Sequence, residues 1–117
     1  MESIELAGYQ PEKEIQLALD VAASEFYSTN KERYVFGSEF FTSLELIQYY
    51  QKICSKYPIV SIEDGLDQND WKHWGILNSR LGKTIQIVGD DLTVTNPFLL
   101  KKAIKDKAMN AILIKLN

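Results

Sequence analysis

The sequence of 117 residues predicts an α/β fold in which parallel strands are joined by crossover helices. Three observations lead to this prediction. Short runs rich in Ile, Leu and Val recur along the chain, longer segments with helical periodicity lie between them, and these segments carry cap or stop residues. An order of strand, helix and strand that repeats in this way is typical of a parallel sheet.

Four apolar runs have the length and composition of buried strands. They are Ile15 to Asp20, Ile59 to Gly65, Thr84 to Asp91 and Ala111 to Asn117. Because side chains alternate between the two faces of a strand, one face is predicted to be aliphatic and to lie against the helices. Val60 and Ile62 are expected on that face. The other face is mixed and ends in charged residues, in chain order Asp20, Glu63, Asp90 and Lys115.

Three helical segments separate these runs. Thr42 and Glu45 have the spacing of a capping box at the start of the first helix. Gly82 is a natural stop for the second, and Asn96 and Pro97 suit the cap and first position of the third. The predicted apolar faces are Leu44, Ile47, Tyr50 and Cys54; Trp71, Trp74, Leu77 and Leu81; and Leu100, Ala103, Ile104 and Ala108.

Composition and charge exclude several classes of protein function. The net charge is −3 and no Lys/Arg patch dominates, which argues against nucleic-acid binding. Cys54 is the only cysteine, so an internal disulfide framework is excluded and a reducing, cytoplasmic setting is favoured. No apolar run has the length of a membrane span, and the N-terminal residues do not resemble a signal peptide. The polar stretch from Tyr27 to Tyr34 is the one long loop or hairpin candidate.

The charged residues at the strand ends indicate a metal site. In parallel α/β sheets and barrels, the carboxyl ends of the strands meet at one edge, where active sites lie. Three carboxylates there need a counter-charge, and Mg²⁺ prefers oxygen ligands and keeps positions open for water or substrate. His73 lies in no His/Cys cluster that suits zinc, and we expect it at the surface. An Asp after a strand is more often a turn residue, but three acids in one register with a lysine favour a site.

Four stretches of the chain resemble a known family. LALDVAASEFY, VSIEDGLDQNDW, VGDDLTVTNP and AILIKLN are similar, in this order, to consecutive barrel-strand motifs of the enolase family, and the resemblance runs from about Ile4 to Asn117. The form SIEDGL is typical of bacterial members. The resemblance implies that residues 1–117 are one partial domain, a half-barrel section of a TIM-type barrel. The N-terminal domain and the rest of the barrel would be absent.

The resemblance also implies a reaction, the dehydration of 2-phosphoglycerate to phosphoenolpyruvate in glycolysis with Mg²⁺. It makes Asp20, Glu63 and Asp90 the ligands of the tighter-held metal. It makes Lys115 the base that removes the proton beside the substrate carboxylate, a pairing of lysine and Mg²⁺ already known for this superfamily. Metal ions stabilise the developing negative charge, and nearby cations lower the pKa of a lysine toward the range in which it acts as a base.

Two further carboxylates receive supporting roles. Asp91 is out of phase with Asp90, and we expect it to turn back and orient Lys115 or main-chain N–H groups. Asp64 is expected to play the matching role beside Glu63. The doublet of Asp90 and Asp91 is therefore interpreted as one metal ligand and one supporting group.

The resemblance implies equally clear absences. The general acid, a downstream histidine, the Arg-Ser phosphate site and a second lysine lie outside these residues, so we expect residues 1–117 alone to be inactive. The outer strands would be the rims of a cut barrel, which favours a homo-oligomer. A cytoplasmic location is expected, with a surface or secreted location as in some bacterial enolases. Two alternatives stay open: a non-catalytic, self-associating module, and another enolase-superfamily enzyme that acts on a different carboxylate.

Overall fold

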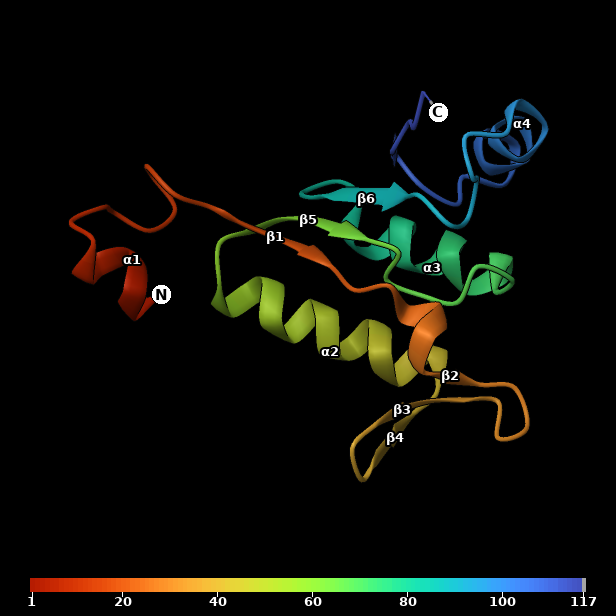
Figure 1. Cartoon of the computed structure of the whole chain (residues 1–117), viewed down its shortest axis with the longest axis horizontal. Helices are drawn as coiled ribbons and strands as arrows, with labels where there is room; N and C mark the ends of the chain where they lie inside the picture. Colours follow the sequence, from red (N-terminus) through yellow and green to blue (C-terminus); the bar gives the residue numbers. More distant parts are fainter. Residues whose placement is uncertain (117) are drawn as a thin grey trace.

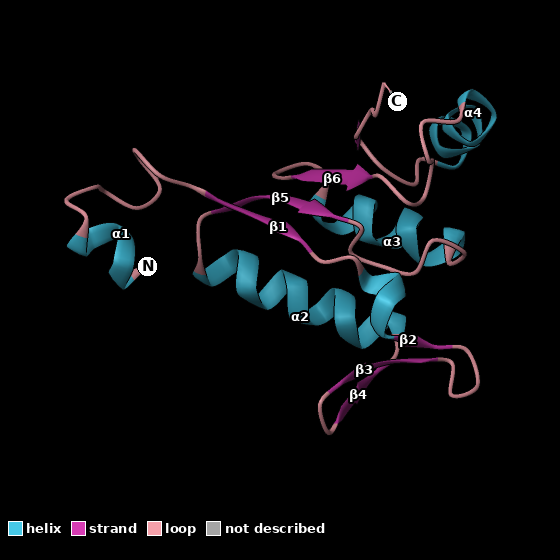
Figure 2. Ribbon diagram, in the orientation of Figure 1, coloured by secondary structure: helices cyan, strands magenta, loops and turns pink. Residues whose placement is uncertain are grey.

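The main sheet of the protein is parallel and four-stranded, with the order β1-β5-β6-β7. A computed structural model describes residues 1–116 (Figure 1). Helices connect successive strands of this sheet, so the predicted α/β fold with crossover helices is confirmed (Figure 2). The strands are β1 (Leu17–Asp20), β5 (Ile59–Glu63), β6 (Gln86–Gly89) and β7 (Ala111–Ile112).

Each strand is shorter than the apolar run that predicted it, because the ends of the runs bond elsewhere. Ile15 forms an isolated bridge with Pro11 before β1 begins. Ile85 donates its N–H to the carbonyl of Leu81, which continues the helix end rather than the sheet. β7 ends at Ile112, because its pairing partner in β6, Gly89, is the last residue of that strand. Of the predicted fourth strand, Asn117 lies outside the described residues.

The phase of β5 differs from the prediction at Val60. The pairing of β1 with β5 shifts by one residue, so that Leu17 pairs with Ile59 and Ala18 pairs with Ser61. Val60 is the extra residue of this bulge, and its side chain is exposed instead of lying against the helices. Ile62, beyond the bulge, is fully buried as predicted.

Helices α2 (Ser43–Lys56) and α3 (Trp71–Leu81) lie along one face of the main sheet, and α4 (Pro97–Asp106) follows β6 (Figure 1). The predicted caps are confirmed. Thr42 and Glu45 form a capping box, and the side chain of Asn96 accepts two N–H groups of α4, whose first residue is proline. The short α1 (Glu2–Leu6) buries no residue and lies apart from the sheet (Figure 1).

The core lies between the sheet and the two helices α2 and α3. Ile47, Trp74, Leu77 and Ile87 are fully buried there. The predicted apolar faces are wrong at Leu44 and Ile104, whose side chains are exposed. Leu46 is buried in place of Leu44, and together with Ile47 and Tyr50 it forms the face of α2 that contacts the core. Ile104 stays exposed because α4 buries a single residue, Ala103, and so packs through a narrow face.

A second sheet, which is antiparallel, is formed by the part of the sequence that connects β1 to α2. It follows the 3₁₀ turn η1 (Ala23–Phe26) and has the order β2-β3-β4, with β2 at Tyr27–Ser28, β3 at Arg33–Phe36 and β4 at Glu39–Phe41. The hairpin of β2 and β3 agrees with the predicted loop or hairpin at Tyr27 to Tyr34. β4 was not predicted, because three residues are too few to show a period. Within the residues that the structure describes, no helix combines the length and apolar character needed to cross a membrane.

Candidate active site

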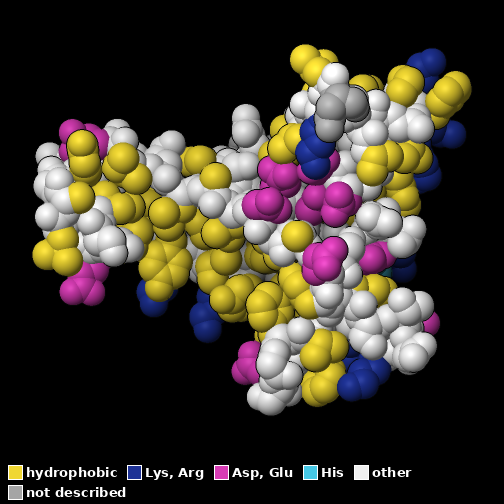
Figure 3. All heavy atoms as spheres, in the orientation of Figure 1, with side chains coloured by type: hydrophobic (Ala, Val, Ile, Leu, Met, Phe, Trp, Pro, Cys, Tyr) yellow, Lys and Arg dark blue, Asp and Glu magenta, His cyan; other side chains and the backbone are white. Residues whose placement is uncertain are grey.

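Acidic residues gather where the parallel strands end. Asp20 is the last residue of β1, Glu63 is the last residue of β5, and Asp90 directly follows β6. Asp20 and Glu63 are partners in the parallel register, and Glu63 pairs with Val88 of β6, so the three strand ends meet at one edge. The space-filling view shows acidic side chains massed in this region with a basic side chain against them (Figure 3).

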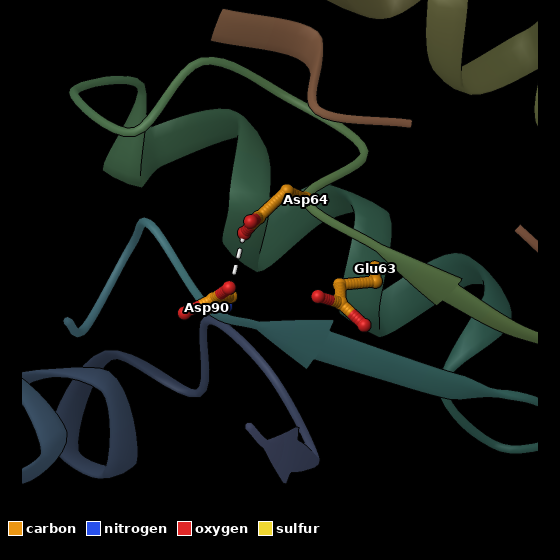
Figure 4. A group of neighbouring side chains, drawn as sticks. All are labelled: Glu63, Asp64 and Asp90. Atoms are coloured by element: carbon orange, nitrogen blue, oxygen red, sulfur yellow. Dashed lines mark hydrogen bonds between the residues drawn. The ribbon is translucent and has the colours of Figure 1, made fainter. Parts of the chain in front are cut away.

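Three carboxylates converge closely at this edge. Glu63, Asp64 and Asp90 each offer an oxygen, and these oxygens lie within 4.8 Å of one another (Figure 4). Mg²⁺ binds oxygen at about 2.1 Å, so its ligand atoms lie at most about 4.2 Å apart across the ion. A small approach of the side chains would therefore suit this ion. All three donors are carboxylate oxygens, the ligand type that a hard cation prefers, so the residues present fit Mg²⁺.

The predicted ligand Asp20 lies beside this cluster rather than within it. Its partner across the ladder is Glu63, and its side chain is exposed at the open face of the sheet. The structure thus brings two of the three predicted ligands, Glu63 and Asp90, into the closest group together with Asp64. Asp64 was predicted only as a supporting residue beside Glu63, in the role that matches Asp91.

The turn at Asp64 explains its position. Its φ of 43° ends β5 in the left-handed region, which redirects the side chain toward the end of β6. Its two carboxylate oxygens accept the main-chain N–H groups of Asp90 and Asp91, each at 3.0 Å. Asp64 is buried, and it therefore connects the ends of two neighbouring strands from inside the protein.

Two of these carboxylates have raised pKa values, and the charges of their neighbours contribute to the increase. Burial raises the pKa of Glu63, and the charges of Asp20, Asp64 and Asp90 raise it further. Burial also raises the pKa of Asp64, although the two N–H groups that it accepts act in the opposite direction. A positive charge among these groups would relieve the repulsion.

Lys115 supplies one such charge. Its Nζ lies 2.6 Å from Oδ2 of Asp90, although β7 has ended three residues earlier. The hydrogen bond and charge of Asp90 raise the pKa of Lys115, and the charges of Asp91 and Glu63 add to the effect. The carboxylates alone therefore hold this lysine protonated. The decrease in pKa that we expected for a catalytic base requires a cation among them.

The structure gives Asp91 a different contact from the expected one. Its main-chain N–H donates to Asp64, and its charge contributes to the raised pKa of Lys115. Among the hydrogen bonds of residues 1–116, none joins its carboxylate to Lys115 or to a main-chain N–H group. The lysine pairs with Asp90 instead.

The sequence did not point to Thr95, which also belongs to this site. Together with Asp90, Asp91, Val94 and Lys115 it lines an open cavity of about 280 Å³. Its hydroxyl oxygen accepts the main-chain N–H of Lys115 at 3.0 Å. Thr95 is distant from Lys115 in the sequence, and no periodic pattern relates the two residues.

A larger cavity, of about 660 Å³, lies between the β2–β3 turn and the starts of α2 and α3. Among its acidic lining residues, Asp70 is already paired, because it accepts from the hydroxyl of Ser43 and contacts Nδ1 of His73 at 2.7 Å. His73 was expected at the surface. It is half-buried, it has Asp70 as its partner, and it is not in the group of potential metal-binding side chains found within residues 1–116. The converging carboxylates, rather than cavity size, locate the candidate site.

A comparison with protein families gives a match that covers the whole chain. The family described as "Enolase, C-terminal TIM barrel domain" matches residues 1–117, which is the whole chain. This description agrees with the parallel sheet, its crossover helices and the position of the acidic cluster at the carboxyl ends of the strands.

Proposed function

The chain belongs to the family of the enolase C-terminal barrel domain, and we propose that it forms the part of a bacterial enolase that carries the metal ligands and the catalytic base. The reaction would be the dehydration of 2-phosphoglycerate to phosphoenolpyruvate, a glycolytic step in the cytoplasm. One observation supports this most directly. The ammonium of Lys115 contacts Asp90 at 2.6 Å, and Asp90 lies within 4.8 Å of Glu63 in the acidic cluster.

The proposed metal ligands are Asp20, Glu63 and Asp90, which end three neighbouring strands. Asp64 contributes a fourth carboxylate to the same group. Mg²⁺, when bound there, would stabilise the negative charge that develops on the substrate carboxylate as the neighbouring proton is removed. The raised pKa of Glu63 supports this assignment. Burial is its main cause, and the charges of Asp20, Asp64 and Asp90 add to it; a shared cation would offset this repulsion.

Lys115 is the proposed base. It lies at the same edge as the carboxylates, and it lines the open cavity together with Asp90, Asp91 and Thr95. A lysine accepts a proton only as the neutral amine, whereas the carboxylates around Lys115 favour its charged form. Lys115 therefore loses its proton readily only when the negative charge of these groups is satisfied by another cation.

The supporting residues hold this arrangement together. Asp64 fixes the main chain of Asp90 and Asp91, which sets the direction in which the Asp90 carboxylate points. Asp91 adds negative charge next to Lys115. The metal ligands and the base thus depend on one short loop after β6.

The test uses the complete protein that carries this barrel, with 2-phosphoglycerate as substrate and ultraviolet absorbance of phosphoenolpyruvate as the readout. Lys115→Ala should abolish formation of phosphoenolpyruvate, because it removes the proposed base. Lys83→Ala, at the opposite end of β6, is a control and should leave the rate unchanged. If the unsubstituted protein does not turn over 2-phosphoglycerate but turns over another carboxylate, a different enolase-superfamily reaction is favoured.

A further inference from the structure

The loop that follows β6 has an unusual main chain. Val94 and Thr95 have φ values of 43° and 55°, in the left-handed region that β-branched residues rarely adopt. Such conformations persist where the surrounding contacts require them, and they are common at functional sites. The contact that this conformation makes possible is therefore informative.

Thr95 holds the main chain of Lys115. The N–H of Lys115 donates to Oγ1 of Thr95 at 3.0 Å. β7 ends at Ile112, and the last main-chain bond to the end of β6 is the one from Leu113 to Gly89 at 3.1 Å. Among the hydrogen bonds described for residues 1–116, the contact with Thr95 is the one that ties the Lys115 main chain to the site.

The loop presents this hydroxyl from a firmly held turn. The side chain of Thr93 is fully buried, and its hydroxyl donates to the carbonyl of Gly89 at 3.2 Å. The N–H of Val94 donates to the carbonyl of Asp90 at 2.7 Å. The loop that carries Thr95 is therefore fixed relative to Asp90, and Thr95 accepts the N–H of Lys115 from this fixed position.

Lys115 is thus held at two points, one on its side chain and one on its main chain. Its ammonium pairs with Asp90 at 2.6 Å, and its main-chain N–H bonds to the hydroxyl of Thr95. Because lysine has a flexible four-carbon stem, an anchor on its main chain limits where its amine can move.

We infer that Thr95 is a positioning residue for the proton-abstracting step of Lys115. This inference rests on the proposed function of Lys115 as the base. Thr95 contacts the main chain of the lysine rather than a reacting atom, so it acts through Lys115. What matters is its acceptor oxygen, since a residue of the same shape without that oxygen leaves the Lys115 N–H without its partner in the loop.

The first experiment measures hydrogen exchange of the Lys115 amide by NMR in the folded chain. Thr95→Val keeps the branched shape and removes the acceptor, whereas Thr95→Ser keeps the acceptor. Thr95→Gly also removes the acceptor but accommodates the left-handed backbone, so it addresses the case in which Thr95→Val fails to fold. Thr84→Val is the matched control, because the Thr84 hydroxyl bonds to Leu81 at the other end of β6.

We expect the Val and Gly variants to exchange the Lys115 amide roughly 3- to 10-fold faster, as loss of one hydrogen bond predicts. The Ser variant and the Thr84 control should stay within about twofold of the unsubstituted chain, since each keeps the acceptor of Lys115. An unchanged exchange rate in both the Val and the Gly variants would overturn the inference.

The second experiment measures solvent exchange of the substrate proton next to the carboxylate, in the complete protein. Thr95→Val and Thr95→Gly should lower this rate by roughly 10- to 100-fold with KM unchanged, because a displaced catalytic group costs rate rather than binding. Thr95→Ser should restore the rate. Faster amide exchange with a normal rate would show that the anchor is merely structural and would overturn the inference. If the unsubstituted protein also fails to exchange this proton, the proposed function itself is wrong, and the role of Thr95 falls with it.

Discussion

The main-chain N–H of Asp90 donates to Oδ1 of Asp64 at 3.0 Å, which joins the ends of two parallel strands through one buried carboxylate. The other oxygen of Asp64 accepts from Asp91 at the same distance. Asp64 therefore positions the loop that carries Asp90, and through Asp90 it affects the contact with Lys115. This residue was expected in a supporting role, and the structure shows the contacts through which it acts.

The first prediction concerns the stability that Asp64 provides. Asp64→Ala removes the acceptor of two N–H groups and should lower the free energy of unfolding by about 1.5 to 3 kcal/mol, the range for hydrogen bonds to a charged group. Asp64→Asn should cost less, because Asn keeps an acceptor oxygen and tolerates the left-handed backbone at this position. Urea denaturation of both variants gives the comparison. If Asp64→Asn and Asp64→Ala lower the free energy of unfolding equally, the role assigned to the carboxylate is wrong.

The second prediction concerns Mg²⁺ binding by the 117-residue chain. Binding should be weak, in the millimolar range, because an open and hydrated site adds few ligands beyond its carboxylates. It should strengthen as pH rises through the raised pKa of Glu63, since the carboxyl must lose its proton to bind the ion. Titration calorimetry at several pH values measures both effects.

Variants make the metal prediction specific. Glu63→Gln and Asp90→Asn should each remove most of the binding heat. Glu39→Gln, in the exposed strand β4, should change nothing and serves as the matched control. Micromolar affinity, or equal binding by the Glu63 variant, would speak against a weak site built from these residues.

The third prediction is that residues 1–117 alone form no measurable phosphoenolpyruvate. The main sheet of the described residues has four strands, whereas a complete barrel has eight. The enolase resemblance also places the general acid outside these residues, and loss of such a group alone lowers a rate by roughly 10²- to 10⁴-fold. An ultraviolet assay with the complete protein as the positive control tests this. A rate near that of the complete protein would refute it.

The fourth prediction is that the chain self-associates. β1 and β7 are the outer strands of the main sheet and each has one free edge among residues 1–116. Ala18 is exposed on the face opposite α2 and α3, and Leu113 is half-buried. Pairing of two chains about a twofold axis would cover both the edges and this face. Light scattering at micromolar concentration decides the point, and a folded monomer of 13.4 kDa would contradict it.

The fifth prediction concerns the capping box of α2. Thr42→Ala should lower the free energy of unfolding by about 1 kcal/mol, as is usual for the loss of an N-cap side chain.

The hydrogen bonds from Thr42 lower the pKa of Glu45. The stabilisation by Glu45 is therefore present above its unfolded pKa and is lost as pH falls through the folded value. Glu45→Gln should therefore destabilise the chain at neutral pH and make no difference in acid. Urea denaturation at both pH values checks this, and an equal effect at both would contradict the assigned cause.

The sequence by itself determined the features that depend on neighbouring residues along the chain. The alternation in each strand predicted that Asp20, Glu63 and Asp90 would reach the carboxyl edge of a parallel sheet, and the structure places them there. The caps at Thr42 and Asn96 were also predictable, because a helix start is a local arrangement of a few residues. The four family motifs in order made the fold class specific, and the match over the whole chain supports it.

Only the tertiary structure decided how these segments meet. The bulge at Val60 comes from the pairing of two strands, and the exposure of Ile104 comes from the narrow face through which α4 packs. The left-handed turn that brings Asp64 to Asp90, and the hydroxyl of Thr95 that holds Lys115, join residues about 20 or more positions apart. No local period encodes such contacts. They arise because packing in three dimensions fixes the main chain, and the main chain then sets which polar groups come within hydrogen-bonding distance.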